Sequence, residues 1–123
     1  MLLVLDLLWR GYRVVLTTHS PQLLTAVWML GQLQKLKASP QRLLEGFGVK
    51  ASASMKQLAE AALQKSYRTH LFELGGDAKV RSVDISSLDP GAEDERVAGW
   101  GGLTGFSSRL GEAVRIAVNE SAG

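Results

Sequence analysis

The chain has 123 residues, of which 46% are hydrophobic and 21% are charged. These proportions are those of an ordinary globular protein, and the length is sufficient for one domain with its own core. The formal net charge of +2 gives no sign of a general polyanion binder, and the absence of cysteine excludes disulfides and thiolate metal sites.

The charges are unevenly distributed along the chain. Residues 1–68 contain nine Lys or Arg residues against three Asp or Glu residues, a net charge of +6, so the remainder carries −4. The basic residues are scattered, and Trp9 and Trp28 occupy apolar helix positions where core packing is expected rather than base stacking. We therefore expect nucleic acid to be involved only indirectly.

The N-terminal residues are strongly apolar but do not form a typical targeting signal. Met1–Leu5 has no basic segment before it, Asp6 interrupts the apolar run, and no small-residue cleavage site follows. No apolar stretch approaches the roughly 20 residues of a membrane span. We expect a cytoplasmic protein that does not enter a membrane.

The first elements predict part of a parallel sheet. Residues 1–10 favour a buried helix that ends at Gly11, and Arg13–Thr17 follows as a strand. Val14, Val15 and Leu16 form the continuous apolar run that is typical of a central parallel strand covered by helices on both faces. No second buried parallel strand is evident, so this sheet would be incomplete.

Three helices are predicted next. Ser20 followed by Pro21 indicates a helix start, and apolar residues at helical spacing extend this helix to about Lys37. Ser39-Pro40 starts a short helix that runs to Leu44. Residues 55–66 form another, with Ser54 as its cap.

The last third predicts a hairpin and a helix. The arms 67–74 and 79–85 flank Gly75–Ala78, a glycine-rich turn, and His70 is expected to be exposed on a strand. Residues 84–95 suit a solvated acidic loop better than a calcium loop. Residues 99–105 suit a tight turn in which the Trp100 side chain packs against the protein. The final helix, about 109–119, would be capped by Ser107 or Ser108 and would point these residues inward: Leu110, Val114, Ala117 and Val118.

The stretch Thr17-Thr18-His19-Ser20-Pro21, between the predicted strand and helix, resembles the switch-histidine region of ABC/SMC-type ATPases, particularly the AAA-like, OLD- and RecF-related ATP-binding proteins. The similarity extends from about Leu5 to Leu36, and the Trp100–Leu103 phrase adds to it. In that family the histidine approaches the γ-phosphate and the attacking water. The resemblance implies a catalytic role for His19 and nucleotide contacts for Thr18, His19 and Ser20.

The resemblance also implies a fold. This fold is α/β, an incomplete P-loop-NTPase-like sheet of the ABC ATPase type with covering helices, a β-hairpin and a C-terminal helix. Residues 1–38 would be its helix–strand–helix part with the switch-histidine loop, 39–66 a helical segment, and 67–123 the hairpin, the acidic and glycine-rich loop and the last helix. All three would belong to one ATPase domain.

Other interpretations of His19 come from the residues alone. A histidine after a strand often hydrogen-bonds nearby backbone, and without the resemblance that structural role would be preferred. Ser20 beside His19 does not indicate a nucleophile–base pair, because sequence neighbours rarely point at one another and no third orienting group is evident. His19 and His70 are the only histidines and have no metal-ligand spacing, so we expect no metal site.

Most parts of an ATPase site are missing from the sequence. There is no Gly-x-x-x-x-Gly-Lys-Ser/Thr segment, no apolar strand ending in acids and no Leu-Ser-Gly-Gly signature. We therefore expect the C-terminal portion of a protein that binds ATP and Mg²⁺ when complete, whereas this chain alone should bind neither. Its partner would be a second ATPase domain or a longer chain that supplies the P-loop. The alternative is a non-enzymatic interaction module, or a remnant, that docks on a partner completing its sheet.

Overall fold

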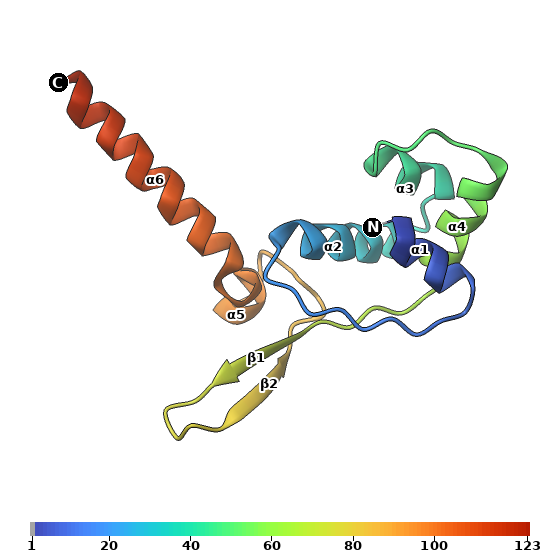
Figure 1. Cartoon of the computed structure of the whole chain (residues 1–123), viewed down its shortest axis with the longest axis horizontal. Coiled ribbons are helices and arrows are strands. Elements are labelled where there is room, and N and C mark those ends of the chain that lie inside the picture. The colour runs from blue at the N-terminus through green and yellow to red at the C-terminus, as the bar shows by residue number, and fades with distance from the viewer. Residues whose placement is uncertain (1) are drawn as a thin grey trace. The chain divides into compact units, whose positions relative to one another are not determined.

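The computed structural model describes residues 2–123, apart from the side chains of Leu2, Phe106 and Ser107. The described residues form helices and one small antiparallel sheet, so the fold is a mixture of helix and strand (Figure 1). The elements in chain order are α1 (Leu2–Trp9), α2 (Pro21–Lys35), α3 (Pro40–Gly46), α4 (Ala53–Leu63), β1 (His70–Leu74), β2 (Val80–Asp84), α5 (Glu95–Ala98), the 3₁₀ helix η1 (Trp100–Gly102) and α6 (Leu103–Ala122).

The chain forms two compact units. The first consists of the chain up to Thr18 together with Gln22–Tyr67, and the second of His19–Pro21 together with Arg68–Gly123. Within the described part of the chain, no helix is both long enough and apolar enough to cross a membrane.

The core of the first unit is built from four helices. α4 packs against both α1 and α3. The buried side chains at the centre of this core are all leucine or alanine: Leu5, Leu30, Leu43, Leu44, Ala59 and Ala62. Half-buried side chains from α2, α4 and the segments that follow α3 and α4 surround them. The predicted helices over residues 1–10, 21–37, 40–44 and 55–66 are thus confirmed, with small differences at their ends.

Hydrogen bonds across the last turn end these helices. After α1, the N–H of Gly11 donates to the Leu8 carbonyl and the N–H of Tyr12 to the Leu7 carbonyl, both at 3.0 Å. This is the Schellman arrangement, which needs a left-handed residue, and Gly11 supplies it with φ +88°. The predicted stop at Gly11 is confirmed. After α2, Lys37 is the left-handed residue, with φ +51°. Its Cβ atom makes this conformation less favourable than it would be for glycine.

The predicted cap of the fourth helix is wrong by two residues. Ser52, not Ser54, precedes α4, and its hydroxyl oxygen accepts from the Met55 N–H at 3.2 Å. Ser52 has the extended backbone that places a capping hydroxyl over the first turn, whereas Ser54 already lies inside that turn.

The predicted parallel strand at Arg13–Thr17 is also wrong. Residues 12–20 have no regular secondary structure. Val15 is 90% exposed and Leu16 is 52% exposed. A strand needs a neighbour for its N–H and C=O groups, and the sheet of the described residues contains only β1 and β2. An apolar run therefore does not become a strand without a partner.

The predicted hairpin is confirmed. β1 and β2 pair antiparallel, with Leu71 opposite Val83 and Leu74 opposite Val80. The turn closes with the N–H of Gly75 donating to the Lys79 carbonyl at 2.9 Å. Exposure alternates along β1, so Leu71 and Glu73 are half-buried, while His70 is exposed as predicted.

The last helix differs from its prediction at its start and in its environment. α6 begins at Leu103, because Gly101 and Gly102 have left-handed backbones that end the turn there. Ser108 lies inside the helix, its hydroxyl donating to the Thr104 carbonyl at 3.1 Å, so it is not the cap. The side chain of Ser107, the other predicted cap, lies outside the described residues. The apolar residues that were expected to point inward are exposed: Leu110, Val114, Ala117 and Val118.

Candidate functional site

The switch-histidine stretch lies directly before α2. Pro21 is the first residue of the helix, as predicted from the Ser20-Pro21 pair. His19 and Thr17 are exposed, while Thr18 and Ser20 are half-buried. The imidazole is therefore accessible to a ligand or to another chain.

The helix that follows has a favourable field for an anion. α2 is 15 residues long, has no acidic residue in its first turn and has Lys35 in its last. Its first N–H groups have no intrahelical partners, and the aligned peptide dipoles place positive potential at this end. The stretch thus combines an accessible imidazole with the start of a helix whose first turn contains no acidic residue.

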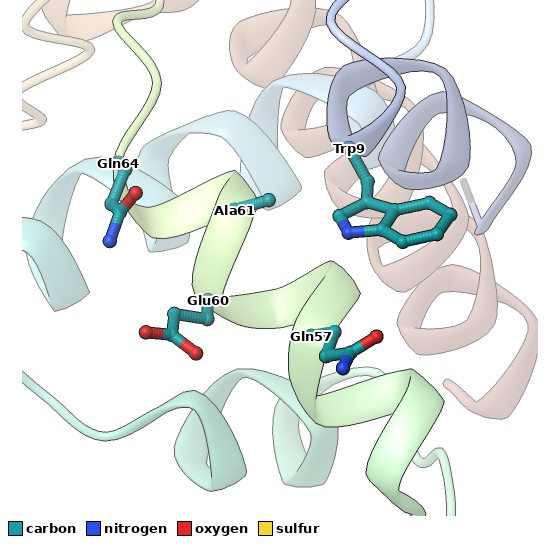
Figure 2. Close-up of a pocket in the computed structure, with 5 residues that line it drawn as sticks. All are labelled: Trp9, Gln57, Glu60, Ala61 and Gln64. Carbon is teal, nitrogen blue, oxygen red and sulfur yellow. The ribbon is translucent and has the colours of Figure 1, made fainter.

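A shallow hollow of about 220 Å³ lies elsewhere in the first unit, between α1 and α4 (Figure 2). Trp9 of α1 borders it, and the other lining residues come from α4: Gln57, Glu60, Ala61 and Gln64. Glu60 is the single carboxylate among them, so the lining offers no acid–base pair. None of the predicted nucleotide-binding residues belongs to it.

Trp9 itself differs from the sequence-based expectation. It was expected in the core, but it is 47% exposed, and the Arg10 guanidinium lies 5.9 Å from its ring centroid. The sequence contains one indication of this exposure. Arg10 follows Trp9 at the end of the helix, and an arginine in that position can cover the indole face.

The aspartates of the acidic loop accept local hydrogen bonds. Asp94 caps α5 by accepting from the Arg96 N–H at 2.9 Å, and it also pairs with the Arg96 guanidinium. These hydrogen bonds lower the pKa of the Asp94 carboxyl. Hydrogen bonds from Ser86 likewise lower the pKa of Asp84. Among the described residues, no group of three or more His, Asp or Glu side chains is arranged to hold a metal.

The glycine-rich segment forms the predicted tight turn. Trp100 is half-buried, and its indole N–H donates to the Leu88 carbonyl at 2.8 Å. Leu88 is fully buried, so this bond fastens the turn to the acidic loop of the same unit. The segment has a structural role in this unit.

The comparisons with known proteins give no relative. No family model matches this chain, and neither a curated protein nor a solved structure is similar to it.

Proposed function

We propose that this chain is the C-terminal portion of an ATP-binding and ATP-hydrolysing protein of the AAA-like ABC type, in which His19 senses the γ-phosphate. The observation that carries the proposal is the exposed His19 immediately before the start of a 15-residue helix with no acid in its first turn. A phosphate group is attracted to such a helix start, and an imidazole N–H can donate to it.

The residues here would supply only one part of the site. The His19 imidazole would donate to a γ-phosphate oxygen or orient the attacking water, and Thr18 and Ser20 would shape the loop around it. When bound, ATP and Mg²⁺ provide the phosphoanhydride and its charge neutralisation. The P-loop lysine, the magnesium-binding hydroxyl and the acidic strand have no counterpart in this sequence. A second ATPase domain or a longer chain would have to supply them.

The proposal requires the segment before His19 to gain a strand partner, which the described residues do not provide. Val14–Leu16 is apolar and has the composition of a buried strand, yet residues 12–20 have no regular structure. In a complete P-loop-type sheet this segment would pair with a neighbouring strand and bring Thr18, His19 and Ser20 to the carboxyl edge, where ligands bind in open α/β sheets.

The test is His19→Ala in a complete protein that contains the P-loop. ATP hydrolysis should fall by about 100-fold, the usual scale for loss of a positioned acid–base or transition-state group, while ATP binding is retained. His70→Ala is the matched control, because His70 is also exposed but lies on β1, and it should leave turnover unchanged. Unchanged hydrolysis in His19→Ala would contradict the proposal.

The exposure of Val15 also favours a second candidate, a non-enzymatic module whose apolar segment adds to the sheet of a partner. Such a complex would survive His19→Ala, because the imidazole has no part in it. Val15→Pro would abolish it, because proline has no N–H for the ladder. A complex that depends on His19 but tolerates Val15→Pro would count against this candidate.

A further inference from the structure

The hollow between α1 and α4 combines an aromatic ring with polar side chains that are open to solvent. Its α4 residues recur at intervals of three and four positions, so they share one side of that helix: Gln57, Glu60, Ala61 and Gln64. Figure 2 shows the Trp9 ring beside Gln57 and Ala61, with the Glu60 carboxylate across the helix from it. The hollow therefore has an indole at one edge and a carboxylate at the other.

Glu60 has no basic partner, although the first unit is rich in basic residues. That unit contains eight Lys or Arg residues and three acidic residues. Asp6 and Glu45 each pair with a nearby arginine, at 3.0 Å and 2.9 Å, whereas no ion pair within the described part of the chain includes Glu60. Lys56 lies one turn before Glu60, but a lysine that precedes a glutamate on a helix is in the less favourable order. The carboxylate is thus open to a basic group from another molecule.

The size of the hollow suits one side chain of a partner better than a small molecule. Its volume is about 220 Å³ and it is shallow, whereas pockets for small molecules have about 300 to 1,000 Å³ and enclose most of the ligand. A basic side chain suits both edges, because its aliphatic stem packs on an aromatic ring while its charged head pairs with a carboxylate. Trp9 is 47% exposed, so part of its ring is open to such a stem.

Arginine fits this lining better than lysine. Its planar guanidinium donates two parallel hydrogen bonds to a carboxylate, and its remaining N–H groups can donate to the amide oxygens of Gln57 and Gln64. The Trp9 ring also accommodates a guanidinium nearby, since that of Arg10 lies 5.9 Å from its centroid.

We propose that the hollow binds an arginine side chain of a partner polypeptide. The stem lies over the Trp9 ring and the Ala61 methyl group, and the guanidinium pairs with Glu60. Acidic residues flank this arginine in the partner, because the eight basic residues of the first unit repel a polybasic segment. The site requires no nucleotide and shares no residue with the proposed role of His19, so either proposal can fail without the other.

Nuclear magnetic resonance of the whole ¹⁵N-labelled chain tests this binding, with the peptide acetyl-Glu-Arg-Glu-amide as the probe. The indole N–H signal of Trp9, assigned by its loss in Trp9→Phe, should shift saturably in the millimolar range. The indole signals of Trp28 and Trp100 are internal controls and should not move, because neither residue lines the hollow. No saturable shift of the Trp9 signal overturns the proposal.

Two peptide analogues and an oligonucleotide test which ligand the hollow selects. Citrulline has the shape of arginine without its charge, and lysine has the charge without the planar fork, so both peptides should bind more weakly. Oligothymidylate should leave the Trp9 signal in place, since Glu60 repels phosphate. Equal binding of either analogue, or a saturable shift with oligothymidylate alone, overturns the assignment to arginine.

A matched pair of charge variants tests the role of Glu60. Glu60→Gln should weaken binding of the arginine peptide by about tenfold, because the amide keeps the shape of the side chain but loses the charge-assisted hydrogen bonds. Glu45→Gln removes the same charge from another exposed position of the first unit and should leave the affinity unchanged. Far-UV circular dichroism verifies that both variants fold. Equal losses of affinity in the two variants, or none in Glu60→Gln, overturn the proposal.

Discussion

Tyr67 is a polar side chain that joins the chain just after α4 to the core of the first unit. Its hydroxyl donates to the Ala62 carbonyl at 2.6 Å, and its ring packs against the leucine core. Burial disfavours the charged phenolate and raises the pKa of Tyr67 from 10.0 to about 12. The neutral form is thus favoured in the folded state.

This shift predicts a loss of stability in alkaline solution. The pKa of Tyr67 in the folded state, about 12, exceeds the unfolded value of 10.0. The contribution of Tyr67 to the free energy of unfolding is therefore complete below pH 10 and is lost as the pH rises toward 12. Urea unfolding of wild type should therefore show a falling free energy over this window. Tyr67→Phe should show a smaller fall.

Tyr12→Phe is the control for this titration. Tyr12 is the other tyrosine and is 61% exposed, so its replacement should leave the alkaline fall as in wild type. An equal fall in all three proteins would mean that Tyr67 is not the group responsible.

At the scale of elements, the second unit depends on a close approach between η1 and β1. A Cβ atom at Gly101 would lie 2.6 Å from Leu71 Cδ1, and Gly101 has a left-handed backbone with φ +68°. Gly102 also has a left-handed backbone, with φ +92°, but nothing lies within 4 Å of its Cβ position. The Glu73–Arg96 ion pair lies on the same half-buried face of the hairpin. The inner face of β1 thus packs on a turn that has no side chain at its nearest point.

The two glycines give a matched pair of substitutions. Each change to alanine should cost about 1 kcal/mol for the left-handed backbone. Gly101→Ala should cost about 1 kcal/mol more, because Leu71 must turn aside. Denaturant unfolding measures both, and adding Leu71→Ala should remove the extra cost of Gly101→Ala. Equal costs at the two glycines, with no coupling to Leu71, would show that the close approach contributes nothing.

At the scale of the whole molecule, apolar side chains are divided between a small leucine core and an extensive exposed set. Leu5, Leu30 and Leu43 are fully buried, whereas the segment at Val15 and the face of α6 are exposed. Burial of apolar surface is the main source of stability, so the exposed set contributes little to the free energy of unfolding of this chain. The strand contact proposed for the segment at Val15 uses part of that exposed set.

Two threonine substitutions compare the contributions of a buried and an exposed apolar side chain to stability. Val15→Thr should change the free energy of unfolding by less than about 0.5 kcal/mol and should raise solubility, because Val15 is 90% exposed. Leu30→Thr should cost about 3 kcal/mol, since it leaves a void and buries a hydroxyl. Urea unfolding and salt-induced precipitation are the measurements. A loss at Val15 similar to that at Leu30 would show that residue 15 is packed.

The sequence by itself determined the elements that depend on local chemistry. Gly11 and Pro21 mark helix ends because one permits a left-handed backbone and the other suits a first helical turn. The Gly75–Ala78 turn and the alternation on β1 predicted the hairpin, and the glycines near Trp100 predicted a tight turn. At the candidate site, the sequence predicted the position of His19 before a helix, and its nucleotide role stays a prediction.

Only the tertiary structure decided which apolar residues find a partner. Val14–Leu16 has the composition of a buried strand, but Val15 and Leu16 are exposed, because pairing requires a second strand that local sequence cannot specify. The periodicity of α6 predicted an apolar face correctly and its burial wrongly, since a period defines a side of a helix without stating what lies against it. Burial is a property of the neighbours that folding brings together, and that is why it could not be read from either segment alone.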